Sequence, residues 1–203
     1  MDQDVEASNL KILIGATGSI HSALLPAYLN YFEREVPNVE ISIVVTHSCT
    51  RIIPVLTLSA YCHGRVFGPD NDVTEEGVPR HIDLAGWPDE ILVLPASANT
   101  IRKIAQGSAE DLLSAIVLAS TARVTLAPAM SFNMWNSAAT RENIERIRKF
   151  GLHVLESTSS LPVSNENAKP GVAPTPRVVI RYINSRLYEN QQARAFLDGV
   201  RKV

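Results

Sequence analysis

The sequence predicts an α/β fold: a single doubly wound (Rossmann-like, flavodoxin-like) parallel sheet with helices on both faces. Two observations support this class. Short apolar runs alternate along the chain with segments whose apolar side chains recur at helical spacing, and turns rich in small residues follow several of the runs. The 203 residues, with 45% hydrophobic and 20% charged side chains, suit one globular domain over residues 1–203.

Strands are expected where apolar or β-branched runs stand between turn residues. Residues 10–15 (LKILIG) form a continuous apolar run that ends in glycine, which is typical of a strand buried on both faces of a parallel sheet. The β-branched run at 39–46 (VEISIVVT) predicts the next strand. In chain order the expected strands are 10–15, 39–46, a short one at 65–67, 90–94, 123–127 and 152–155.

Helices are expected where apolar side chains return at helical spacing. The helix expected over residues 50–60 contains Pro54, which a helix tolerates only near its first turn. The Gly-, Pro- and Asp-rich residues 64–80 predict a loop, and the polar, aperiodic residues 156–176 predict a mobile segment. In chain order the expected helices run from 20 to about 37, over 50–60, from the turn at 95–100 onward, over 109–119, over 138–150 and from 178 onward.

Composition and charge exclude several function classes. A net charge of −2 offers no large phosphate-binding surface, so we expect no nucleic-acid partner. No apolar stretch approaches the roughly 18 residues of a membrane helix, and the acidic N-terminus does not resemble a signal peptide, so we expect a cytoplasmic protein without a membrane partner. The two cysteines, Cys49 and Cys62, form neither a CxxC pair nor a metal set, so we expect no metal.

The expected fold also predicts the place of the site. In doubly wound sheets, ligands bind at the carboxyl ends of the strands, near the point where the strand order reverses. Three turns meet this condition, at residues 15–19, 95–100 and 128–134.

The first turn favours a phosphate. Gly15 and Gly18 let the backbone approach a ligand closely, while Thr17 and Ser19 are expected to donate hydrogen bonds to it; Thr46, after the second strand, adds a further hydroxyl. A monophosphate is favoured over a dinucleotide, because the full GxGxxG pattern is absent. The alternative is a tight glycine turn with a serine cap.

The second turn, Pro95-Ala-Ser-Ala-Asn-Thr100, places hydrogen-bonding groups at the start of a helix. Ser97, Asn99 and Thr100 suit a planar polar ring. The alternative is that Ser97 or Asn99 only caps the helix.

With His81-Ile-Asp-Leu84 and Trp87, this turn resembles the homo-oligomeric flavin-containing cysteine decarboxylases. The family includes the peptidyl-cysteine decarboxylases of lantibiotic-type peptide biosynthesis and the phosphopantothenoylcysteine decarboxylases of coenzyme A synthesis, both of which bind FMN. The resemblance covers residues 10–150. It includes a third motif, Pro-x-Met-Asn-x-x-Met-Trp, which is present at 128–135 with Ser131 in place of the asparagine.

The resemblance implies roles for residues in all three turns. His81 matches the family's catalytic histidine. The third turn is expected to bind substrate through Ser131, Asn133 and Met134; the family's asparagine helps to hold the substrate carboxylate, and Ser131 offers a hydroxyl instead of that amide. The expected FMN-binding residues are Gly15, Thr17, Gly18, Ser19, Thr46, Pro95, Ser97, Ala98, Asn99, Thr100, Ala129 and Met130.

The activity that the resemblance implies is FMN-dependent oxidative decarboxylation of the C-terminal cysteine of a precursor peptide. FMN oxidises the cysteine to a thioaldehyde, CO₂ leaves, and the resulting enethiol is available to a downstream cyclase. The coenzyme A enzymes reduce the enethiol again with a cysteine on a flap after the last strand. Residues 156–176, the expected substrate flap, contain no cysteine, which favours the peptidyl enzyme.

Three alternatives stay open: a phosphopantothenoylcysteine decarboxylase, a non-catalytic FMN-binding regulatory subunit, and a flavin prenyltransferase. The prenyltransferase lacks the histidine motif present at His81. The resemblance also implies a homo-oligomer, a trimer or dodecamer with FMN at subunit contacts, so His81 and Ser131 need not serve the flavin of their own chain.

Overall fold

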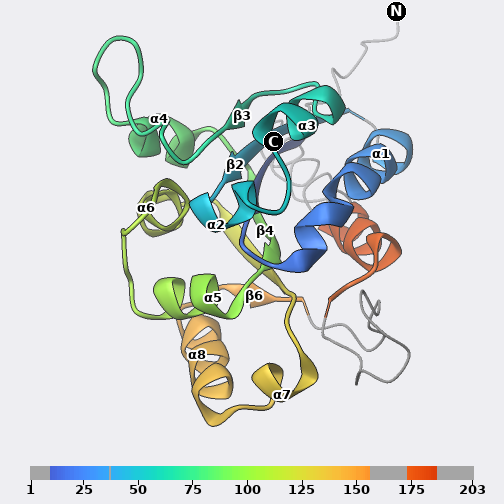
Figure 1. Ribbon diagram of the computed structural model, residues 1–203, viewed down its shortest axis with the longest axis vertical. Coiled ribbons are helices and arrows are strands. Elements are labelled where there is room, and N and C mark those ends of the chain that lie inside the picture. Colours follow the sequence, from blue (N-terminus) through green and yellow to red (C-terminus); the bar gives the residue numbers. More distant parts are fainter. Residues whose placement is uncertain (1–9, 37, 156–172, 187–203) are drawn as a thin grey trace, which may run out of the picture.

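The computed structural model describes residues 10–36, 38–155 and 173–186 (Figure 1). Their strands form one six-stranded sheet in the order β3-β2-β1-β4-β5-β6, and every neighbouring pair is parallel. The sequence prediction of a doubly wound parallel sheet is confirmed. The strands are β1 (Leu10–Ala16), β2 (Val39–Val45), β3 (Val66–Phe67), β4 (Glu90–Ala96), β5 (Arg123–Pro128) and β6 (His153–Val154).

Helices cover both faces of this sheet (Figure 1). None of the helices in the described ranges is long and apolar enough to cross a membrane. A further helical segment occupies residues 176–186. The other helices are η1 (Ile20–Leu24, a 3-10 helix), α1 (Leu25–Glu35), α2 (His47–Thr50), α3 (Val55–Tyr61), α4 (Arg80–Gly86), α5 (Ala98–Ala105), α6 (Leu112–Ala119), α7 (Phe132–Trp135) and α8 (Ala138–Lys149).

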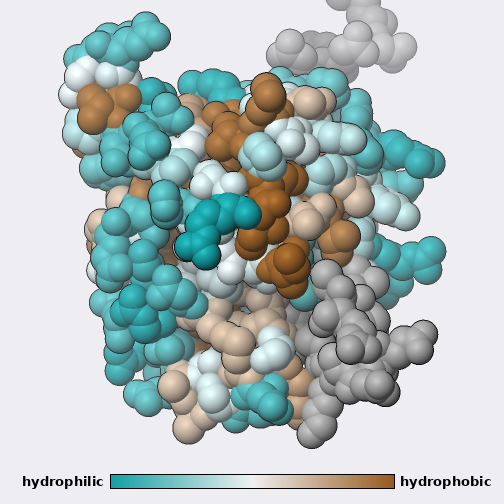
Figure 2. All heavy atoms as spheres, in the orientation of Figure 1, coloured by the Kyte–Doolittle hydropathy of each residue, from teal (hydrophilic) through white to brown (hydrophobic). Residues whose placement is uncertain are grey.

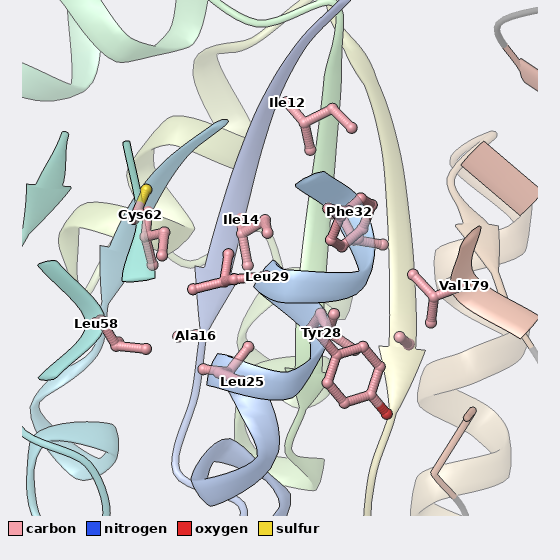
Figure 3. Close-up of a cluster of buried hydrophobic side chains, with 14 of the residues drawn as sticks. Ile12, Ile14, Ala16, Leu25, Tyr28, Leu29, Phe32, Leu58, Cys62 and Val179 are labelled. Carbon is pink, nitrogen blue, oxygen red and sulfur yellow. The ribbon is translucent and has the colours of Figure 1, made fainter. Parts of the chain in front are cut away.

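The alternation of side chains along the strands builds two cores. Ile12 and Ile14 of β1 belong to the first core, where Figure 3 shows them beside α1 and Phe32. Val179, from the helix at 176–186, closes the same core. Leu13 points to the opposite face and belongs to the second core, with side chains of α4, α5, α6 and α8. The central strands are therefore buried on both faces, as their unbroken apolar sequences predict.

Proline accounts for two differences from the expected helices. The helix expected over residues 50–60 is broken into α2 and α3, because Pro54 cannot continue a helix and instead occupies the N-cap of α3. The first helix likewise begins as the 3-10 helix η1 and becomes α-helical where Pro26 can occupy its first turn.

Two short helices were not expected from the sequence. α4 follows the Pro-rich residues and has Pro79 at its N-cap, without a side-chain cap. α7 lies inside the third turn and is capped by Ser131. Residues 156–172 of the expected flap (156–176) lie outside the described residues, so the mobility of the flap stays a prediction.

Candidate functional site

A hollow of about 480 Å³ lies where β1, β2 and β4 end. The strand order reverses between β1 and β4, and the volume is within the range of small-molecule sites. Seven of the residues expected at the site line it: Gly18, Thr46, Ser97, Ala98, Asn99, Thr100 and Met134.

The first turn approaches the hollow through its backbone. Gly18 is exposed, and a Cβ atom there would lie 2.5 Å from Cβ of Ser48, so this position accepts no side chain without movement. Gly15 lies behind it, where an added Cβ would lie 2.5 Å from Cδ1 of Leu113 on α6. The glycines thus let the turn lie close both to the ligand space and to the neighbouring helix, as the sequence predicts.

The hydroxyls of this turn have a different role from the expected one. Thr17 is fully buried, and its Oγ1 donates to the carbonyl oxygen of Pro95 at 2.6 Å. Ser19 is also buried, and its Oγ donates to the carbonyl oxygen of Ala129 at 3.0 Å. A hydroxyl carries one hydrogen, so in this structure neither group is available to donate to a phosphate, and their role in flavin binding stays a prediction. Thr46 is half-buried, and its Oγ1 donates to Ala16 at 3.2 Å.

The second turn leads directly into α5. Ser97 caps this helix: its Oγ accepts from the amide of Thr100 at 3.3 Å and lies 3.1 Å from Oγ1 of Thr100. Asn99 is exposed, and its Oδ1 accepts from Arg102 at 3.4 Å. Pro95 is buried beneath the turn. The cap and the ligand space therefore coexist here, because the N-terminus of α5 lines the hollow and offers a favourable field for an anion.

The third turn is divided between the core and the surface. Ala129 and Met130 are buried, and the amide of Ala129 donates to the carbonyl oxygen of Ala96 at 3.0 Å. Ser131 and Asn133 are exposed, and Oγ of Ser131 accepts from the amide of Met134 at 3.4 Å to cap α7. Of the expected substrate residues, only Met134 lines the hollow, while Ser131 and Asn133 lie outside its lining.

The sequence analysis missed a charged group at the hollow. Nζ of Lys103 lies 2.9 Å from Oδ2 of Asp111 and 3.1 Å from Oε2 of Glu110, and all three side chains line the space. The hydrogen bond to Asp111 is the main reason that the pKa of Lys103 is raised. Lys103 follows Asn99 by one helical turn on α5, and this spacing is the signal that would have found it.

His81 lies in a second hollow beside the first. It is half-buried on α4 and lines a space of about 370 Å³. Asp72, Glu110, Asp111 and Leu112 line both spaces, so they adjoin. His81 does not line the hollow formed by the three turns.

The described residues include no group that could bind a metal ion and no cysteine that is readily ionised. In ranges 10–36, 38–155 and 173–186 no group of three or more His, Cys, Asp or Glu side chains could hold a metal ion. Cys49 and Cys62 are both buried, and burial raises the pKa of each thiol, so neither is a ready thiolate.

Comparison with known sequences places the chain among flavoproteins. The flavoprotein family matches residues 2–188. The mersacidin decarboxylase of a Bacillus species is 34% identical over 150 residues, which are 72% of this chain and 73% of that protein. The coenzyme A biosynthesis bifunctional protein CoaBC of Vibrio vulnificus is 35% identical over 164 residues, or 81% of this chain. The chain spans only 39% of the length of that bifunctional protein.

Solved structures agree with this assignment. SpaF, an FMN-dependent cysteine decarboxylase, is 26% identical with a TM-score of 0.77, and the match covers 90% of this chain and 98% of SpaF. MrsD from a Bacillus species is 28% identical with a TM-score of 0.73, over 89% of this chain and 98% of MrsD. The family spans nearly the whole sequence, and the chain therefore belongs to the flavoprotein family.

Proposed function

We propose that this protein is an FMN-dependent decarboxylase that oxidises the C-terminal cysteine of a precursor peptide to an enethiol. A flavin cofactor is confirmed by the family, and FMN is named for the similar cysteine decarboxylases. One observation carries the choice of reaction: the region after the last strand, 156–176, contains no cysteine that would reduce the enethiol. The mersacidin decarboxylase, similar over 72% of this chain, supports the same choice.

The residues at the three turns suit a phosphorylated flavin. Gly18 and the amides at the start of α5 would hold the phosphate, and Ser97, Asn99 and Thr100 offer polar groups beside the ring. The bound flavin supplies the two-electron oxidation that creates an electron sink for loss of CO₂. His81 would take the thiol proton of the substrate, and the third turn, with Ser131, Asn133 and Met134, would hold its carboxylate end.

The separation of His81 from the first hollow supports an oligomeric site. In a trimer or dodecamer with flavin at subunit contacts, His81 of one copy would act on the flavin held by a neighbouring copy. Exposed apolar side chains support such contacts: Figure 2 shows an apolar strip that runs from α3 to η1, where Leu56 is 82% and Ile20 is 58% exposed. The precursor peptide and a downstream cyclase would be further partners.

A phosphopantothenoylcysteine decarboxylase is the second candidate. The 35% identity to the bifunctional protein of coenzyme A biosynthesis favours it. The two candidates differ in redox balance: the peptidyl enzyme ends with a reduced flavin and an enethiol, whereas the coenzyme A enzyme returns the two electrons to its product and regenerates oxidised flavin.

This difference defines the test. The purified protein, without oxygen, is mixed with a peptide that ends in cysteine, and the visible absorbance of the flavin is followed. We expect bleaching with one peptide modified per flavin, and recovery of the colour when oxygen is admitted. The same peptide with a C-terminal amide is the control and leaves the absorbance unchanged. Repeated turnover without oxygen would contradict the proposal, as would an unmodified free-acid peptide.

A further inference from the structure

Thr17 links two turns that are far apart in the sequence. Its Oγ1 donates to the carbonyl oxygen of Pro95 at 2.6 Å and accepts from the amide of Ser97 at 2.9 Å. The side chain is fully buried, so the hydrogen bond to Pro95 is shielded from water, while the one from the Ser97 amide is partly buried. One hydroxyl therefore fixes the second turn against the first.

The carbonyl group of Thr17 extends the same link. Its oxygen accepts from Oγ of Ser22 at 2.6 Å and from the amide of Ser19 at 2.8 Å, which holds Thr17 at the entrance to η1. The first turn thus holds Thr17, and the hydroxyl of Thr17 ties the second turn to it.

The second turn has few other hydrogen bonds that would hold it here. The hydroxyl of Ser97 is occupied by Thr100 within the turn. The carbonyl oxygen of Ala96 accepts from Ala129, which ties the second turn to the third instead of the first. Displacement of Ser97 would move the N-terminus of α5, and with it four residues that line the hollow.

We propose that Thr17 is a positioning residue of the flavin site, which acts by holding the second turn in the geometry that receives the cofactor. Thr17 would hold the turn without contacting the flavin itself. Its effect on binding passes through the backbone of residues 95–100.

The test compares Thr17→Val with Thr17→Ser. Valine keeps the shape of threonine but removes the hydroxyl, whereas serine keeps the hydroxyl. Amide hydrogen exchange is measured first in the flavin-free protein, at Ser97 and at Thr100. The Ser97 amide loses its hydrogen-bond acceptor in Thr17→Val, so its exchange will change whether or not Thr17 positions the turn. The Thr100 amide reports on the cap of α5, and we expect its exchange to accelerate by about tenfold or more because the whole turn loosens.

Flavin affinity is measured next, by titration of the same flavin-free proteins with FMN. We expect Thr17→Val to weaken binding by about tenfold or more and Thr17→Ser to restore it to within about threefold, because both hydrogen bonds of Thr17 return with the hydroxyl. Thr125→Val is the matched control: Thr125 is equally buried and its hydroxyl is hydrogen-bonded, but its partner is Glu90 at the amino end of β4, whereas the hollow lies at the carboxyl ends of the strands. We expect the control to bind FMN normally.

Three outcomes would overturn the proposal. Weaker FMN binding with unchanged exchange at Thr100 would show that Thr17 contacts the flavin directly. Normal FMN binding by Thr17→Val would show that the link does not position the site. Equal weakening in Thr125→Val would show that general loss of stability explains the effect. Each outcome is independent of decarboxylation, so it leaves the proposed reaction to its own test.

Discussion

Glu90 provides a pH-dependent test of the fold. This residue begins the central strand β4, at the amino end of the strand and away from the flavin site at the carboxyl ends, and is 3% exposed. Its Oε1 accepts from Oγ1 of Thr125 at 2.5 Å and from the hydroxyl of Tyr182 at 3.4 Å. Burial raises the pKa of the Glu90 carboxyl from 4.5 to about 7, although the hydrogen bond from Thr125 and the charge of Arg123 both act to lower it.

The direction of the pH effect follows from proton binding. Between pH 4.5 and about 7, folded Glu90 holds a proton that the unfolded chain releases. The free energy of unfolding therefore falls as the pH rises through this window; the contribution is full below 4.5 and lost above about 7. At about 1.4 kcal/mol per pH unit, the difference between the two pKa values corresponds to about 3 kcal/mol.

The measurement is urea unfolding at pH 5 and pH 8, at one protein concentration and with one excess of FMN, for the wild type and Glu90→Gln. Glutamine has no proton to lose, so its oxygen accepts the same hydrogen bonds at both pH values. We expect the wild type to lose about 2.5 kcal/mol more than the variant between pH 5 and pH 8, because part of the contribution is already lost at pH 5 and other titrating groups contribute equally to both proteins. Equal pH dependence in the two proteins would refute the reasoning.

Three other substitutions test the site and the fold. His81→Asn should keep flavin but lower decarboxylation by about 100- to 10,000-fold, measured as product per flavin; near-normal turnover would contradict a catalytic role. Asn99→Asp should weaken FMN binding or shift the flavin spectrum, since the carboxylate can no longer donate, and an unchanged affinity together with an unchanged spectrum would contradict a role of Asn99 in flavin binding. Gly64→Ala should destabilise the fold by at least about 3 kcal/mol, because the added Cβ would lie 1.8 Å from the carbonyl oxygen of Ile41. Gly86→Ala, whose Cβ meets nothing within 4 Å, is its control in thermal unfolding, and equal loss in both would contradict the steric argument.

Local sequence patterns predicted much of the fold. The apolar run of β1 identified a strand buried on both faces, because such a strand needs no alternation of polar and apolar side chains. α4 was missed, since it follows a Pro-rich stretch and its N-cap, Pro79, has no capping side chain. The break between α2 and α3 was not predicted, because a single Pro54 is compatible with either a first turn or an N-cap.

The sequence predicted the role of a site residue only where that role depends on residues a few positions away along the chain. The glycines of the first turn and the cap of α5 by Ser97 depend on such neighbours. The role of Thr17 depends on Pro95, 78 positions away, and periodicity contains no information on such a contact. The same limit applies to Glu90 and Tyr182, which are 92 positions apart.

Mass spectrometry of the product tests the central claim most directly. The purified protein is incubated in air with a peptide that ends in cysteine, and the peptide mass is compared with that of the untreated sample. Oxidative decarboxylation predicts a loss of about 46 Da, from CO₂ and two hydrogens. A loss of about 44 Da would indicate decarboxylation in which the electrons return to the product, and an unchanged mass would contradict peptidyl-cysteine decarboxylation.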